Sequence, residues 1–593
     1  MATRLKPVDA VIVGMGWCGA ILARELADLG LSVVGLERGE WRNTHPDFAP
    51  GHMHDELGIA VRGQLAQDAS RQTVTFRNHA GETALPLRRL GDFRPGEGVG
   101  GRGATWSGRS LRLLASDFSL RSGIIRRYGE KAVGPDMTIR DWPLSSEDLE
   151  PFYDRFEYVC GVSGKAGNIR GRIVEGGNPF EAPRSRRYPN PPLHASLAMI
   201  LFEAAARRFG LHAFPLPSAN PSRSYTNAYG MTMAACRYCG FCEGFGCAVA
   251  AKASPQTAVL PAPGRAAGFR LRTRAQVLRV DRGRDGARAA GVTYLDAAGH
   301  AFEQPADVVV LAAGVFGNVH LMLVSGIGEP YDPAAGRGVI GANYAHQTQS
   351  SATLFFRDRI FNNFMGAGAL GMAIDDFNGD NFDHTGLDFV GGGAIVAASG
   401  GAHPIRYHPV PPGTPRWGGA WKRAVKHWYN RSMRIETYGA AMAYRGNRLD
   451  LDPVYEDAWG RPLLRLTFDH GANDLRISRH LTAIARQLGA ALRPDHASIR
   501  HEPSPYSPGA AESPPAGHFR DPTGGAIMGD DPRTSAVNRY LQCWDVPNLF
   551  VVGASAFPQH PGCDPTATAA ALAYWAAEAV RLQYVKSPGP LVG

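Results

Sequence analysis

The stretch Val8-Asp9-Ala10-Val11-Ile12-Val13-Gly14-Met15-Gly16-Trp17-Cys18-Gly19 decides the fold of this chain. It begins with a short apolar run typical of a buried strand and ends in a Gly-x-Gly-x-x-Gly turn. Residues 20–29 follow at helical spacing, and a second apolar run, Ser32 to Leu36, leads to Glu37. This order of strand, glycine turn, helix and strand predicts a β-α-β unit that binds a dinucleotide.

Each part of this motif has a chemical role. The glycines let the backbone approach a pyrophosphate, and the start of the helix offers free N–H groups to it. Glu37 follows Gly14 by 23 positions, close to the spacing of a carboxylate that accepts hydrogen bonds from ribose hydroxyls. A carboxylate there also repels a 2′-phosphate. The alternative is an ordinary β-α turn, which the combined context disfavours.

The composition is that of an ordinary globular protein. The 593 residues include 63 Lys and Arg and 54 Asp and Glu, a net charge of +9, with no long block of like charge. Binding to nucleic acid or to a membrane surface therefore gains little support. We find no stretch of about 18 apolar residues without charges or breakers. We therefore expect no membrane span, and no export signal of the chain's own.

Four of the eight cysteines lie close together, as Cys236, Cys239, Cys242 and Cys247. Cysteines so near in sequence are poorly placed to bridge distant parts of a fold, so we do not expect a disulfide framework. Four soft thiolates suit either zinc or an iron–sulfur cluster, and structural zinc usually takes two Cys pairs separated by a longer loop. The spacing of every third residue favours the cluster. Zinc and reduced structural thiols are the alternatives.

Several further stretches carry a family resemblance: Val99–Trp106, Gly366–Gly371, Asn378–His384, Gly524–Gly529, Asn538–Gln542 and Gly553–Gln559. Together with the N-terminal motif they resemble the glucose–methanol–choline (GMC) oxidoreductases. Within that family, the resemblance is to the branch containing the flavoprotein subunits of bacterial gluconate, fructose and glucoside dehydrogenases.

The resemblance implies an α/β protein, α+β overall, with a Rossmann-like FAD-binding domain and a strand-rich substrate domain, an architecture like that of p-hydroxybenzoate hydroxylase. It implies that residues 1–125, 205–330 and 515–593 form a discontinuous FAD-binding domain that includes the cysteine run 236–247. Residues 126–204 and 331–514 would form the substrate domain. The residues expected to bind FAD are Gly14, Gly16, Gly19, Glu37, Arg38, Gly100, Gly101, Trp106, Val277, Ala313, Gly553, Ala554 and Thr566.

The same resemblance implies an activity. The chain would oxidise a hydroxyl of a sugar, glycoside, sugar acid or polyol by hydride transfer to flavin. A three-iron (3Fe-4S) cluster held by three of the four cysteines would relay the electrons. Such flavoproteins commonly work with a small subunit that carries the export signal and with a cytochrome c, which implies a periplasmic location; a cytoplasmic enzyme is the alternative. Two competing hypotheses are an oxidase of the same fold that uses oxygen, and a catalytically weakened flavoprotein that serves as an assembly subunit.

Oxidation by hydride transfer leaves a hydroxyl proton that must go to a base, and histidine is the usual group. Members of the family place a His shortly before a Gly-Gly or Gly-Thr pair and an Asn or His further along. This sequence has Asp521 and Asp564 at those positions. We predict that His518 or His560 is the base, with Asp521 or Asp564 in support. Asp564 precedes Pro565, so capping of the following helix is a second interpretation of this residue.

Overall fold

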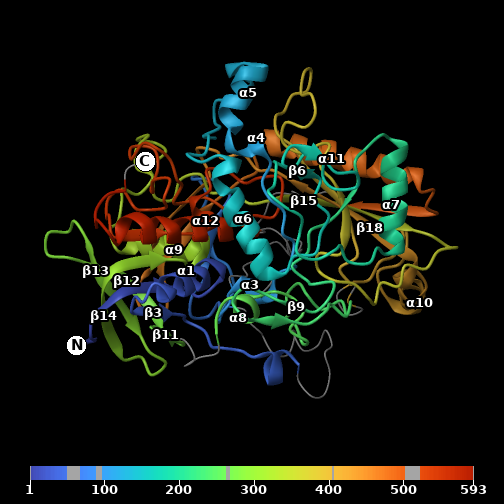
Figure 1. The fold of residues 1–593 in the computed structure, drawn as a ribbon. Helices are drawn as coiled ribbons and strands as arrows, with labels where there is room; N and C mark the ends of the chain where they lie inside the picture. Colours follow the sequence, from blue (N-terminus) through green and yellow to red (C-terminus); the bar gives the residue numbers. More distant parts are fainter. Residues whose placement is uncertain are drawn as a thin grey trace.

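A sheet built around β2 (Val8–Val13) forms one end of the molecule (Figure 1). The computed structural model describes residues 2–49, 67–88, 96–261, 268–401, 403, 407–500 and 521–591. β2 pairs in parallel with β3 (Val33–Leu36) and with β14 (Ala301–Leu311), and β14 pairs in parallel with β22 (Leu549–Val551). The predicted β-α-β unit is confirmed, with α1 (Trp17–Asp28) as its helix.

The sheet extends at both edges. β11 (Phe269–Arg272) pairs in parallel with β3, whereas β13 (Ala289–Leu295) pairs antiparallel with the first half of β14, and β12 (Gln276–Arg282) pairs with β13. β11 and β12 follow each other closely in the sequence, and the chain turns between them at Arg274, whose φ is +52°. The two strands therefore lie at opposite edges of one sheet.

Three helices pack together beside this sheet. α1 packs against the Ala-rich α12 (Thr566–Ala579), and α12 packs against α6 (Ser146–Cys160). The small side chains of α12 allow these three helices to approach closely, and most of α12 is buried. α6 starts with a capping box of Ser145 and Asp148.

A second, antiparallel sheet lies at the opposite end of the molecule, where Figure 1 labels β15 and β18 beside α7, α10 and α11. Helix α11 (Ala472–Ala491) packs on its central strands, and α7 (Leu197–Arg208) packs on β16 and β17. Buried apolar side chains accordingly form two large clusters, one under each sheet. In order across the sheet, the strands are β21 (His496–Arg500), β15 (Thr348–Phe355), β18 (Ser432–Gly439), β17 (Gly393–Ala398), β16 (Gly371–Ile374) and β8 (Phe214–Pro215).

A smaller sheet joins the N-terminal region to the second half of the chain. β4 (Val74–Arg77) pairs in parallel with β20 (Pro462–Thr467), which pairs with β19 (Arg448–Glu456), while β5 (Leu85–Pro86) pairs with β4. The remaining described strands and α-helices are β1 (Thr3–Arg4), β6 (Asn168–Ile169), β7 (Arg172–Ile173), β9 (Tyr225–Thr226), β10 (Thr232–Met233), α3 (Arg102–Thr105), α4 (Ala115–Phe118), α5 (Leu120–Tyr128), α8 (Pro255–Ala258), α9 (Gly314–Val324) and α10 (Gly418–Trp428).

The fold class is confirmed as mixed α/β. One sheet is largely parallel, with β12 and β13 antiparallel at one edge, and a separate sheet is antiparallel. Within the described residues, no helix has both the length and the apolar character needed to cross a bilayer.

Candidate active site

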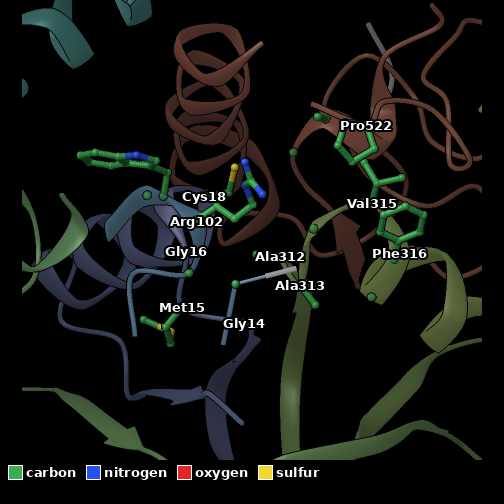
Figure 2. Close-up of a pocket in the computed structure, with 18 of the residues that line it drawn as sticks. Gly14, Met15, Gly16, Cys18, Arg102, Ala312, Ala313, Val315, Phe316 and Pro522 are labelled. Atoms are coloured by element: carbon green, nitrogen blue, oxygen red, sulfur yellow. The ribbon is translucent and has the colours of Figure 1, made fainter. Parts of the chain in front are cut away.

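A cavity of about 370 Å³ opens at the carboxyl ends of β2 and β14. Ligands of open α/β sheets bind at this edge of the strands. Segments that are far apart in the sequence line the cavity. Figure 2 shows the glycine turn with Cys18 and Arg102 on one side, the residues from Ala312 to Phe316 on another, and Pro522 from the C-terminal block.

The glycine turn has the geometry of a pyrophosphate site. Gly14 has a φ of +89°, and a Cβ added there would lie 2.7 Å from the carbonyl oxygen of Ala312. A Cβ on Gly19 would lie 1.9 Å from the carbonyl oxygen of Gly14, so α1 can start this close to β2 only with glycine. A Cβ on Gly16 would lie 4.0 Å from the carbonyl oxygen of Gly100, and no side chain caps α1 at its first turn. The N–H groups at the start of α1 are therefore suited to an anion.

Glu37 is buried at the end of β3 and is held by backbone N–H groups. Its Oε2 accepts from the N–H of Met15 at 3.0 Å, and its Oε1 accepts from those of Gly39 at 3.0 Å and Gly98 at 3.2 Å. Burial raises the pKa of Glu37, while these hydrogen bonds lower it. The carboxylate thus links the glycine turn to a second glycine-rich loop, and it lines the cavity at the position predicted for ribose recognition.

Most residues predicted to bind FAD line the same cavity. Two do not: Gly19 lies behind the turn, and at Gly100 a Cβ would meet the side chain of Gln256 at 2.4 Å. Both have a packing reason to be glycine. The predicted residues that line the cavity are Gly14, Gly16, Glu37, Arg38, Gly101, Trp106, Val277, Ala313, Gly553, Ala554 and Thr566.

Two carboxylates of the C-terminal block line the cavity, Asp521 and Asp564. Asp521 has a φ of +48°, a left-handed conformation that is uncommon outside glycine and that often marks functional positions. Asp564 Oδ2 lies 3.9 Å from Arg109 Nη1. The helix α12 begins at Thr566, and its N-cap is Pro565, with no side-chain cap. Pro565 already has helical dihedral angles, so Asp564 stands directly before the first residue in helical conformation, and its capping of α12 stays a prediction.

Arg109 is buried in the wall of the cavity, and no local sequence motif points to it. Its Nη2 donates to Glu436 Oε2 at 3.3 Å, and its guanidinium lies 4.5 Å from the ring centre of Tyr438. Burial alone lowers the pKa of Arg109, but the negative charges of Asp564 and Glu436 and the phenol of Tyr438 raise it well above its usual value. Arg109 therefore places a positive charge beside the carboxylates of Glu436 and Asp564.

The two candidate histidines have different outcomes. His518 lies outside the described residues. His560 is buried and is not among the residues that line the cavity; with Asp117 and Asn378 it borders a separate space of about 10 Å³. Burial lowers the pKa of His560 to about 4, against the opposing charge of Asp521. His560 Nδ1 lies 2.6 Å from the carbonyl oxygen of Pro561.

All eight cysteines are free thiols, so no disulfide framework is present. Several N–H donors point at sulfur atoms of the predicted cluster ligands. Asn220 Nδ2 lies 3.7 Å from Cys242 Sγ and 3.9 Å from Cys236 Sγ, and the backbone N–H groups of residues 251 and 252 lie 3.3 and 3.4 Å from Cys247 Sγ. Hydrogen bonds to sulfur are a regular feature around iron–sulfur clusters. This donor set fits a thiolate-bound group.

The loop from Cys236 to Cys247, hereafter the cysteine loop, extends from the cavity to the surface. Glu243 lines the cavity, whereas Cys239 is exposed. In the described part of the chain, no three His, Cys, Asp or Glu side chains are grouped as ligands of a single metal ion. The iron–sulfur cluster and its zinc alternative both stay predictions for this loop.

Comparison with known proteins agrees with this geometry. Two models described as GMC oxidoreductase match residues 223–349 and 443–573. The chain is 47% identical to a gluconate 2-dehydrogenase flavoprotein of Pantoea cypripedii, over 100% of this chain and 96% of the relative. It is 25% identical to the fructose dehydrogenase large subunit of Gluconobacter japonicus, over 98% of this chain and 99% of the relative.

Solved structures agree with the fold. The pyridoxine 4-oxidase from Mesorbium loti superposes with a TM-score of 0.59 at 18% identity, covering 97% of this chain and 99% of that chain. At this identity the likeness concerns the architecture alone.

Proposed function

The chain belongs to the GMC oxidoreductase family, and from this premise we propose that it oxidises a sugar acid, sugar, glycoside or polyol and relays the electrons through an iron–sulfur cluster to a protein partner. The chain is an FAD-dependent oxidoreductase of the dehydrogenase type that acts on CH–OH donors. The observation that carries the proposed relay is that the cysteine loop forms part of the wall of the FAD cavity, through Glu243.

When bound, FAD accepts the hydride from the carbon that carries the hydroxyl group. The protein's part is to hold it. The glycine turn and the start of α1 would bind the pyrophosphate, and Glu37 would accept hydrogen bonds from the ribose. The first strands and α1 already have the necessary shape, since Gly14 and Gly19 let the turn lie against β14.

The hydroxyl proton needs an acceptor inside the cavity, and the described acidic residues near its C-terminal wall are Asp521 and Asp564. We assign the base to this pair. Arg109 Nη1 lies 3.9 Å from Asp564 Oδ2 and places a positive charge beside this carboxylate. His518 remains a prediction, and so does His560, which borders a separate small space.

The relay is supported by the path of the cysteine loop. A two-electron flavin that feeds a one-electron acceptor requires a carrier that takes single electrons, and an iron–sulfur cluster supplies that chemistry. Cys239 brings the loop to the surface, where a protein partner can approach. One relative is a gluconate 2-dehydrogenase flavoprotein and another is the large subunit of a fructose dehydrogenase, which supports the proposal that this chain works with further subunits.

From the resemblance we further propose that these partners are a small signal-bearing subunit and a cytochrome c, with a periplasmic location. A cytoplasmic enzyme with another acceptor is the alternative. Fractionation of the native host, followed by detection of the chain with a specific antibody, decides between the two compartments.

The test of the relay compares oxygen with an artificial one-electron dye as acceptor. We expect the wild type to turn over much faster with the dye. Cys239→Ser should lose acid-labile sulfide and most dye turnover while its FAD is still bleached by substrate. Cys543→Ser removes a buried free thiol outside the loop and serves as the matched control. Turnover with oxygen as fast as with dye, unchanged in C239S, would favour an oxidase of the same fold.

A further inference from the structure

Lys252 is completely buried between the cysteine loop and the FAD cavity, with 0% of the residue exposed. Its Nζ donates to three backbone carbonyls, those of Trp106 at 2.8 Å, Cys242 at 2.6 Å and Phe245 at 2.9 Å. A lysine ammonium has three N–H donors, whereas a neutral amine has two. The three acceptors therefore match the charged form of the side chain.

These hydrogen bonds satisfy the donors of Lys252 but do not neutralise it, because all three acceptors are uncharged carbonyls. Removing an ammonium from water is costly unless negative charge lies nearby. Two cysteines of the loop lie beside Lys252: its Nζ donates to the carbonyl oxygen of Cys242, and its backbone N–H points at Cys247 Sγ. Thiolates there would supply the counter-charge that the buried ammonium needs.

The segment around Lys252 contacts both the loop and the cavity wall. The N–H groups of Ala251 and Lys252 point at Cys247 Sγ, at 3.3 and 3.4 Å. In the other direction, Trp106 Nε1 donates to the carbonyl oxygen of Ala253 at 2.7 Å, and Trp106 itself lines the cavity. Lys252 is thus placed between the group that receives the hydride and the group proposed to carry single electrons.

We propose that Lys252 is a charge-compensating residue: its ammonium offsets the negative charge of the thiolate-bound cluster and makes that cluster easier to reduce. This inference rests on the proposed function, since it requires the cluster to be present. Each electron that the cluster takes up adds one negative charge, and a cation fixed in a poorly solvated site stabilises the more negative state. Lys252 is not among the residues that line the cavity, so we assign its effect to the cluster.

The variant that tests this is Lys252→Gln, which keeps N–H donors and removes the charge. Arg237→Gln is the matched control, because it removes a charge from an exposed position in the same loop, where solvent screens it. Iron, sulfide and FAD are measured first, and the cluster is then titrated potentiometrically with detection by electron paramagnetic resonance. We expect K252Q to be at least about tenfold harder to reduce, a negative shift of about 59 mV for one electron. R237Q should shift much less.

An unchanged midpoint potential in K252Q, with iron and sulfide at wild-type ratios to FAD, overturns the proposal. If K252Q has lost its iron, the potential cannot be compared, and Lys252→Arg, which keeps the charge, is measured instead. A role of the charge predicts that K252R retains iron. Loss of iron from both variants contradicts that role. Absence of iron and sulfide from the wild type refutes the relay itself and this inference with it. A purely structural role for Lys252 would alter melting temperature without changing the potential.

Discussion

Asp521 and Asp564 occupy the two positions where the family resemblance leads one to expect a histidine and an amide or second histidine. The structure brings both carboxylates to one cavity and pairs Asp564 with Arg109. An ionised carboxylate can accept the proton of a substrate hydroxyl, as an imidazole does. The substitution therefore changes the chemical identity of the base and leaves a base in place.

We expect Asp521→Asn and Asp564→Asn to slow the bleaching of FAD by substrate, one of them by about 10²-fold or more, the usual scale for loss of a general base. His560→Gln should slow it by much less, because His560 borders a different space. Anaerobic stopped-flow absorbance measures the rate. The carboxylate assignment is refuted if both aspartate variants reduce FAD at nearly the wild-type rate while H560Q or His518→Gln is much slower. The base would then be that histidine.

Glu37 offers a second test at the same scale. Glu37→Arg leaves the N–H groups of Met15, Gly39 and Gly98 without their acceptor and places a cation beside them. One buried unpaired donor costs about 1–3 kcal/mol, and every 1.4 kcal/mol is about tenfold in affinity. We therefore expect E37R to purify with little FAD. Glu37→Gln, which keeps one acceptor oxygen, should retain more.

The ratio of FAD to protein after denaturation measures this effect. Glu40→Gln is the control, because Glu40 is exposed and outside the cavity. Full FAD content in E37R would show that Glu37 does not support the cofactor site.

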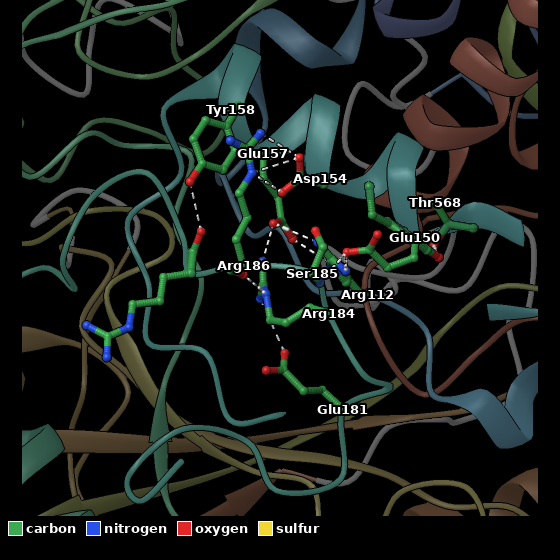
Figure 3. Close-up of polar contacts among 12 residues, drawn as sticks. Arg112, Glu150, Asp154, Glu157, Tyr158, Glu181, Arg184, Ser185, Arg186 and Thr568 are labelled. Atoms are coloured by element: carbon green, nitrogen blue, oxygen red, sulfur yellow. Dashed lines mark hydrogen bonds and ion pairs between the residues drawn. The ribbon is translucent and has the colours of Figure 1, made fainter. Parts of the chain in front are cut away.

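At the scale of elements, a buried ion network ties α6 to two loops (Figure 3). Glu157 of α6 accepts from Arg112 at 2.7 and 2.9 Å and pairs with Arg184, which also lies 3.4 Å from Glu181. Arg112 belongs to the segment that runs on from the cavity wall at Arg109. The network therefore fixes that segment against α6.

Glu157→Gln leaves two buried guanidinium groups without their shared carboxylate. Breaking a buried pair in this way costs about 3–5 kcal/mol. Arg186→Gln breaks the neighbouring pair with Asp154, in which the arginine is half exposed, and such pairs contribute about 0–1 kcal/mol. Thermal melting should show a large fall for E157Q and almost none for R186Q. Equal melting temperatures for the two variants would contradict the role of the network.

At the scale of the whole molecule, the sequence allowed prediction where the signal is local. The unit from Val8 to Glu37 could be recognised because strand, turn and helix follow directly and each glycine has a steric reason. The turn at Arg274 between β11 and β12 could not, since nothing in an arginine marks a positive φ. The first half of β14 has no local signal either: only its second half lies in the buried parallel part of the sheet and has an apolar run.

In the candidate site, too, residues of a local motif could be predicted and residues brought together by the fold could not. The cofactor residues in the glycine turn follow from a motif, whereas Arg109 and Lys252 acquire their roles from segments that meet only in the folded chain. Arg109 meets Glu436 across 327 positions of sequence, and Lys252 meets Trp106 across 146. A single sequence holds no local trace of such contacts, because they depend on how the two sheets are placed.

The central claim is that a CH–OH substrate delivers electrons first to FAD and then to a cluster in the same chain. The most direct measurement is an anaerobic absorbance titration of the purified protein with sugar acids, sugars and polyols. FAD takes two electrons and the cluster one, so the account predicts bleaching that ends at about 1.5 equivalents of a two-electron substrate per FAD. An end point of about one equivalent would contradict transfer of electrons from FAD to a cluster. If dithionite bleaches the flavin but no sugar acid, sugar or polyol does, oxidation of these CH–OH substrates is contradicted.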